Sequence, residues 1–249
     1  MANVGLFGKL PTVGDFVSRG LSPALCERLD QLLQGALVAA TRDGADARQV
    51  MEQAAPLMVS IRPGALCGTG FTGVWIPSRD RVGRVFPLCV GRETAPDQSQ
   101  VPLLWPSPAL TRLLCTSVVK ALQAQAGPDE VVAALPPAAE WDAAAVERIP
   151  FSDMGDETVP AVSSESRLFA LAGPEAGMPL GNRALCSRLP WIVQLLGTRV
   201  APDGSAECYF ASRGVEPAQH YAALFDGRWT QWQWDGYEAA EPVAGGQSS

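Results

Sequence analysis

Histidine is almost absent from this chain, in which His220 is the only one among 249 residues. A catalytic triad or a multi-histidine metal site would therefore depend on this single imidazole. It lies beside Tyr221 in a predicted surface helix, and no G-x-S-x-G nucleophile motif is present. We expect a structural or exposed histidine, and we expect no catalytic residue, no metal site and no cofactor.

Long apolar runs are also missing. No segment approaches the ~18 apolar residues of a membrane-spanning helix, and no basic-plus-apolar signal segment stands at the N-terminus. The six cysteines show no C-x-x-C spacing, and several lie in apolar runs, where a free thiol packs as a small hydrophobic group. These absences predict a cytoplasmic protein with reduced cysteines and no membrane insertion.

Basic residues are few and scattered. The chain has 19 lysines and arginines against 26 acidic residues, which gives a formal net charge of −7. A nucleic-acid-binding domain needs a massed basic surface, and an anionic membrane would repel this chain. We expect neither nucleic acid nor a membrane surface as a partner.

The most strongly patterned segment of the chain is residues 60–91, with the strand that leads into it. Short apolar runs at 57–61, 71–76 and 85–90 are rich in β-branched or aromatic residues, and glycine and proline turns separate them. They predict three adjacent strands. The turn at 77–84 carries three arginines and one aspartate, so the predicted sheet presents a charged tip.

Helices and strands are predicted around this sheet. A first strand at 4–7 is followed by a polar loop and a helix with Ser22 as its N-cap and Pro23 at its first position. The other expected elements are helices at 45–54, 110–122, 129–135, 140–149, 180–189 and 217–225, and strands at 167–172, 191–198 and 206–211. A turn at Pro202-Asp203-Gly204 would make the last two strands a hairpin.

We therefore expect an α/β fold with a mixed, largely antiparallel sheet and helices on its faces, in a three-layer arrangement. Residues 1–238 are predicted to form a single domain. The small-residue tail at 239–249 is predicted to be disordered.

Two glycine motifs suggest nucleotide binding but fail on context. Gly68, Gly70 and Gly73 satisfy G-x-G-x-x-G, yet a predicted strand follows where a dinucleotide site needs a helix. These glycines more simply allow a bend or close strand packing. Gly8-Lys9 is no phosphate loop, because Leu10 stands in place of the serine or threonine that would hold magnesium.

Two further groups allow two interpretations each. A carboxylate trio could bind a hard cation, but its spacing matches no calcium loop, so a solvated acidic loop is preferred. Its members are Asp153, Asp156 and Glu157. The tryptophans at 229, 232 and 234 alternate with polar residues, and packing against the hairpin is a plainer account than an aromatic contact surface.

Several short motifs resemble one protein family. They are Gly5-Leu-Phe-Gly-Lys-Leu-Pro11, Gly14-Asp-Phe-Val17, Pro63-Gly-Ala-Leu-Cys-Gly68 and Pro77-Ser-Arg-Asp-Arg-Val-Gly-Arg-Val-Phe-Pro-Leu88, with weaker matches at 210–217 and 221–227. Together they resemble the TagF-type accessory proteins of the bacterial type VI secretion system. The resemblance implies a non-enzymatic cytoplasmic regulator that restrains assembly of that system after translation. The family is associated with a forkhead-associated scaffold protein, so a similar partner is implied here.

The candidate partner-binding residues are polar and charged side chains of the two segments that carry most of these motifs, 5–21 and 60–91: Lys9, Asp15, Arg19, Arg62, Ser78, Asp80 and Arg84. In one interpretation Asp15 or Asp80 pairs with an arginine and pins loops at one end of the sheet. In the other the charges form a recognition patch for a partner protein, and Arg84→Glu would weaken binding without affecting the fold. The rival function is a hydrolase or small-ligand-binding enzyme that uses the loops around Asp15, Asp80 and Arg84, although no nucleophile or tuned general base is identified.

Overall fold

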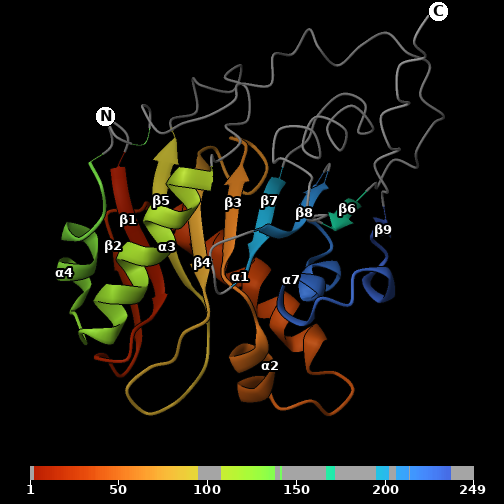
Figure 1. Cartoon of the computed structure of the whole chain (residues 1–249), viewed down its shortest axis with the longest axis horizontal. Helices are drawn as coiled ribbons and strands as arrows, with labels where there is room; N and C mark the ends of the chain where they lie inside the picture. Colours follow the sequence, from red (N-terminus) through yellow and green to blue (C-terminus); the bar gives the residue numbers. More distant parts are fainter. Residues whose placement is uncertain are drawn as a thin grey trace, which may run out of the picture.

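The computed structural model describes residues 3–94, 108–137, 141, 167–171, 195–201, 206–212 and 214–236. The strands in these residues form one nine-stranded sheet in the order β2-β1-β5-β4-β3-β7-β8-β6-β9 (Figure 1). Their bounds are β1 Asn3–Lys9, β2 Phe16–Arg19, β3 Leu57–Ile61, β4 Gly70–Ile76, β5 Leu88–Thr94, β6 Arg167–Leu171, β7 Leu195–Val200, β8 Ala206–Ser212 and β9 Asp235–Gly236. All neighbouring strands are antiparallel except the pair β6 and β9.

Helices lie on both faces of this sheet. The longer ones are α1 Pro23–Ala40 and α3 Pro108–Gln123, and the shorter ones are α2 Ala47–Gln53, α4 Pro128–Ala133, η3 Ala218–Ala222, α7 Ala223–Asp226 and η4 Thr230–Trp232. Helix α1 begins as predicted, because the Ser22 side chain accepts the N–H of Leu25 and Pro23 occupies the first turn. A second contact fixes this start, since Glu93 accepts hydrogen bonds from both the N–H and the hydroxyl of Ser22.

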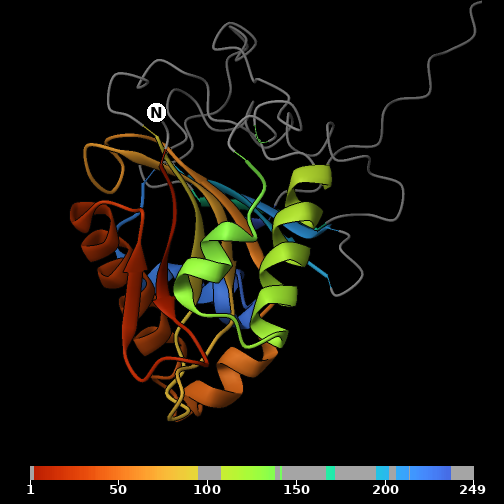
Figure 2. The same ribbon diagram turned by 90° about the vertical axis from the view of Figure 1, so that its left-hand side faces the viewer.

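The sheet separates two hydrophobic cores, because successive side chains of a strand point to opposite faces. One core lies between the sheet and α1, α2, η3 and α7, and the other lies between the sheet and α3 and α4. Val59 and Trp75 enter the first core, whereas their neighbours Met58 and Val74 enter the second. The two helical layers are seen on either side of the sheet in Figure 2. The predicted fold class, a largely antiparallel sheet flanked by helices, is confirmed.

Some predicted boundaries are wrong. The strand expected at 85–90 begins only at Leu88 and continues to Thr94, because Pro87 has no N–H to donate and Phe86 N–H bonds to Ser78 O across the turn. Strand β2, which pairs with the end of β1, was expected to be loop. The pairing of β7 with β8 confirms the hairpin, although its predicted turn lies outside the described residues. The helix at 180–189, most of that at 140–149, and the tail also lie outside them.

Two glycines face each other near the centre of the sheet and lie under an aromatic ring. Gly73 of β4 pairs in register with Gly91 of β5, which pairs on its other side with Gly5 of β1. A Cβ at Gly73 would lie 2.8 Å from Phe71 Cζ, and a Cβ at Gly91 would lie 2.5 Å from the same atom. The third glycine of the G-x-G-x-x-G motif is thus a strand position with no room for a side chain, as close strand packing predicts.

Candidate functional site

The buried carboxylate of Asp80 organises the end of the sheet at which β1 and β4 finish. Lys9 Nζ and Arg84 Nε each donate a hydrogen bond of 2.7 Å to Asp80 Oδ2. The Asp80 side chain is fully buried and the Lys9 side chain is 6% exposed, whereas that of Arg84 is 58% exposed. The Lys9 ammonium also lies 4.6 Å from the ring centroid of Phe16. A buried ammonium therefore neutralises a buried carboxylate, and a surface guanidinium completes the cluster.

The same carboxylate shapes the turn between β4 and β5. Asp80 Oδ1 accepts the backbone N–H of Val82 at 3.0 Å and that of Arg84 at 2.9 Å. Gly83 has a φ of 88°, in the left-handed region that glycine adopts without steric cost. The Asp80 N–H also donates to Arg84 O at 2.9 Å. The conformation of this turn thus depends on the side chain at position 80.

Hydrogen bonds also join this turn to the loop that follows β1. Ser78 Oγ donates to the carbonyl oxygen of Lys9 at 2.8 Å, and Arg84 Nη2 donates to the carbonyl oxygen of Gly14. Ser78 is buried. Asp80 and Arg84 therefore have the arrangement of the first interpretation, in which a carboxylate paired with an arginine pins loops at one end of the sheet, and Lys9 and Ser78 add contacts that it did not include.

The pKa of Asp80 reflects this environment. Burial raises the pKa of the carboxyl, but hydrogen bonds from Lys9 and from the backbone and side chain of Arg84 outweigh burial and hold the pKa well below its usual range. A general base needs a pKa near the working pH and access to the proton that it removes. Asp80 has neither property, so its geometry is that of a structural anion.

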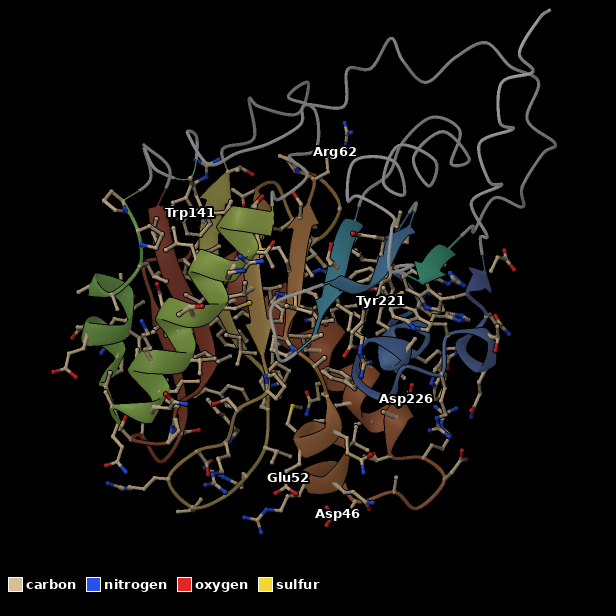
Figure 3. The ribbon with its side chains drawn as sticks, in the orientation of Figure 1. Asp46, Glu52, Arg62, Trp141, Tyr221 and Asp226 are labelled. Carbon is tan, nitrogen blue, oxygen red and sulfur yellow. The ribbon has the colours of Figure 1, made fainter. Side chains whose placement is uncertain are left out.

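The other predicted site residues do not join this cluster. Asp15 is exposed, accepts the N–H of Phe16 at 2.8 Å, and forms no ion pair within the described part of the chain. Arg19 turns toward α4, where its Nε lies 3.0 Å from Asp129 Oδ1. Arg62 follows β3 and lies at the opposite end of the sheet from Glu52 of α2, as Figure 3 shows, and burial lowers its pKa. The expectation that the charged set gathers at one end of the sheet is wrong for Arg62, because β3 runs antiparallel to β4.

The structure changes the expectation for Arg84→Glu. Because Arg84 bonds to Asp80, a glutamate at position 84 would place a second carboxylate beside a buried one. We expect Tm to fall by roughly 3 °C, a small effect because the guanidinium is largely solvated. Thermal unfolding followed by circular dichroism measures it, with Arg112→Glu on the exposed face of α3 as control. Equal Tm values for the two variants would show that Arg84 contributes nothing to the cluster.

An open pocket of about 260 Å³ lies beside the turn. Its apolar wall comes from Pro11, Met51, Pro77, Val85 and Leu122, on four separate segments of the chain. The charged side chains Arg48, Glu52 and Arg79 border it, and Arg48 Nε lies 3.4 Å from Glu52 Oε1. The loop after β1, helix α2, the turn and the end of α3 thus meet around one concave surface.

Three exposed residues of the turn were missed as site residues, namely Arg79, Arg81 and Val82. The signal that could have found them is the high arginine content of the turn, in which Arg79 and Arg81 stand on either side of Asp80 and Val82 precedes Gly83-Arg84. Sequence reasoning selected the residues that resemble the family motif, and the structure shows that Lys9, Ser78 and Asp80 among them are buried.

His220 is structural. Its Nδ1 lies 2.9 Å from the carbonyl oxygen of Trp232, and its own carbonyl oxygen accepts the indole N–H of Trp234 at 2.8 Å. The side chain is buried, so the prediction of a surface helix is wrong at this residue. Trp229 and Trp234 pack on Phe210 of β8 with ring centroids 5.6 and 6.0 Å away, which confirms packing against the hairpin.

Potential ligands for a metal ion are dispersed. No group of three or more histidine, cysteine, aspartate or glutamate side chains in the described ranges is placed to hold a metal ion. The acidic trio at 153, 156 and 157 lies outside those ranges. None of the five cysteines that the structure describes forms a disulfide, and burial raises the pKa of Cys115 to about 12.

Comparisons with known proteins agree with the motifs of the sequence. A family model described as the TagF N-terminal domain, type VI secretion system-associated, matches residues 5–137. The crystal structure of PA0076 from Pseudomonas aeruginosa PAO1 has a similar fold, with a TM-score of 0.57 and 21% sequence identity over 98% of this chain and 100% of that one. No curated protein matches significantly. None of the helices in the described residues is long and apolar enough to cross a membrane.

The family match covers more than half of the chain and includes most of β1, strands β2 to β5, the loop after β1 and the turn around Asp80. It confirms the resemblance seen in the motifs at 5–17, 63–68 and 77–88. The chain belongs to the TagF N-terminal domain family of type VI secretion system-associated proteins.

Proposed function

We propose that this chain is a cytoplasmic accessory protein that represses assembly of the type VI secretion system after translation, by binding another protein of the system. The observation that carries the proposal is the family match over residues 5–137. The proposed partner is a forkhead-associated scaffold protein, as the family resemblance implies. Repression by binding requires a surface for the partner and no chemical step.

The polar groups of the loops support binding over the rival enzymatic function. A hydrolase built on these loops would use Asp15, Asp80 or Arg84 to bind or activate its substrate. Asp80 is buried and accepts four hydrogen bonds from protein donors. The Arg84 guanidinium makes one of these four bonds and donates a further one to the carbonyl oxygen of Gly14. Asp15 is exposed, and among the described residues its side chain bonds only to the backbone N–H of Phe16. These groups serve the loop conformation rather than a reaction.

Deletion of the gene in its native host tests the proposal. We expect the deletion strain to secrete more type VI substrate into the medium, with unchanged amounts of the system's component proteins, because a repressor that acts after translation has been lost. Expression of the chain from a plasmid restores the lower level. Unchanged or reduced secretion in the deletion strain contradicts repression, and altered component levels contradict an effect after translation.

A further inference from the structure

The turn between β4 and β5 presents arginines around an exposed apolar side chain. Arg79, Arg81, Val82 and Arg84 are exposed, and Val82 is 68% exposed. We call these four residues the arginine tip. A cluster of arginines is unusual for this chain, which carries a net charge of −7.

The arginine tip has more positive charge than its surroundings neutralise. Lys9 cancels the charge of Asp80, and Glu52 pairs with Arg48 of the neighbouring helix. Arg79 and Arg81 form no ion pair within the described part of the chain. The carboxylates of Asp15 and Asp46 accept the backbone N–H groups of Phe16 and Arg48 but stay charged, so they offset two of the three positive charges of the tip. The excess charge of the tip therefore favours an anionic ligand.

The arginine tip is also held in place before any ligand binds. The backbone of the tip is fixed by the hydrogen bonds that Asp80 accepts from the N–H groups of Val82 and Arg84. The N–H of Arg81 also donates to Val13 O at 2.9 Å. Two guanidinium groups converge on Gly14, because Arg84 Nη2 donates to its carbonyl oxygen and a Cβ at this position would lie 3.4 Å from Arg81 Nη2. Binding to such a surface loses little conformational entropy.

The adjoining pocket narrows the choice of ligand. Its wall is largely apolar, and Arg79 and Val85 of the turn belong both to this pocket and to the base of the tip. A free inorganic anion would leave the apolar wall in water. A peptide segment with acidic residues beside one apolar side chain fits both features, since guanidinium groups bind carboxylates through paired hydrogen bonds and an apolar side chain fills the pocket.

We propose that the arginine tip and the pocket beside it bind an acidic segment of the partner protein that carries an apolar anchor residue. This proposal rests on the proposed function, because it assigns the surface through which the repressor contacts its partner. The buried residues Lys9 and Asp80 hold that surface in place from beneath, and Ser78, which lines the pocket, joins it to the loop after β1.

A peptide experiment tests the surface without the partner protein. The probe is a fluorescein-labelled peptide with two glutamates on each side of a leucine, and the control probe has glutamines in their place. By fluorescence anisotropy at low salt, we expect the glutamate peptide to bind the wild-type chain on the order of tenfold more tightly than the glutamine peptide, with affinity that falls as salt is added. No binding, or equal binding of both peptides, overturns the proposal.

Variants then place the peptide on the chain. We expect Arg79→Glu with Arg81→Glu to weaken binding on the order of tenfold, and Arg112→Glu to leave it unchanged. The side chains of Arg79 and Arg81 do not bond to Asp80, and Arg112 lies on the exposed face of α3. The double tip variant and Arg112→Glu should therefore both keep the wild-type Tm. The tip variant changes the net charge by four units and Arg112→Glu by two, so a loss of binding free energy only about twice that of Arg112→Glu would indicate a net-charge effect alone and overturn the proposal. Phosphatidylglycerol vesicles that bind as tightly as the glutamate peptide would assign the tip to lipid and overturn it too.

The scaffold protein of the native host separates the two proposals. Calorimetry should show that the scaffold binds the wild-type chain and Arg112→Glu equally, and binds the Arg79→Glu, Arg81→Glu variant on the order of tenfold more weakly. Equal binding to all three means that the partner contacts another surface, so the tip proposal fails while the proposed function stands. If the scaffold binds none of them but the glutamate peptide binds the tip, the proposed partner is wrong and the assigned surface stands.

Discussion

Asp80→Asn is expected to lower the Tm of the chain by about 10 °C, the largest effect of any substitution in the charged loops. The amide can still accept the two backbone N–H groups of the turn, but it carries no negative charge. The Lys9 ammonium, with a side chain only 6% exposed, would then remain buried with no carboxylate beside it. An uncompensated buried charge is among the most destabilising changes that a protein can undergo.

The control for this variant is Asp15→Asn, which makes the same chemical change on the neighbouring loop at an exposed position. It should move Tm by about 1 °C at most, because exposed side chains with one local hydrogen bond contribute little. Adding Lys9→Met to Asp80→Asn should restore part of the lost stability, since no buried charge then lacks a partner. Differential scanning calorimetry measures the three variants and the wild type. Equal Tm values for Asp80→Asn and Asp15→Asn would contradict the pinning role.

The low pKa of Asp80 gives this stabilisation a pH dependence. In the unfolded chain the carboxyl titrates near its ordinary pKa of about 4, and in the folded chain it titrates well below that. The ion pair therefore contributes fully above about pH 4, and its contribution is lost as the pH falls toward the folded pKa. The Tm difference between wild type and Asp80→Asn should be constant near neutral pH and shrink below pH ~4.

Gly91→Val is expected to reduce the free energy of unfolding by about 3 kcal/mol, which makes it the second large effect. The added side chain would lie in the space of the Phe71 ring, whose nearest atom would be 2.5 Å from the new Cβ. Phe71 is fully buried in the core that the sheet forms with α1, so a shift of the ring would displace the side chains packed around it. The backbone carbonyl oxygen of Thr72, also 2.5 Å from that Cβ, prevents relief from the other side.

Urea unfolding measures this change, and Gly68→Val is the matched control. Gly68 lies on the loop before β4, and a Cβ there would meet no atom within 4 Å. We expect the control to lie within about 0.5 kcal/mol of wild type. Similar midpoints for the two variants would show that the sheet does not pack as closely at Gly91 as the register indicates.

The periodicity of the sequence is enough to predict much of this fold. The runs at 57–61 and 71–76 are strands because buried β-branched and aromatic residues lie between turn residues, and α1 begins where Ser22 and Pro23 indicate. Strand β2 could not be predicted, because four residues with one buried side chain carry no clear alternation. Its conformation comes from pairing with β1, which is a tertiary effect.

The candidate site was predictable in its location and not in its burial. The charged turn and the loop after β1 do meet, and Asp80 pairs with an arginine, Arg84, as one of the two interpretations held. Sequence alone could not tell that the main cation is a buried lysine, because lysine is rarely buried unless it is paired. Sequence alone also could not show at which end of the sheet Arg62 lies, because this depends on the direction in which β3 runs.

The extent of the sheet bears on where this protein could be divided. The family match ends at residue 137, yet β7 pairs with β3 along all five residues of that strand, and β3 is buried throughout. A fragment that ended at residue 137 would therefore expose the unpaired backbone N–H and C=O groups of β3, an apolar strand from the middle of the sheet. We expect such a fragment to aggregate through this edge. We therefore expect that the residues matched by the family model are fewer than the residues that this chain needs to fold independently.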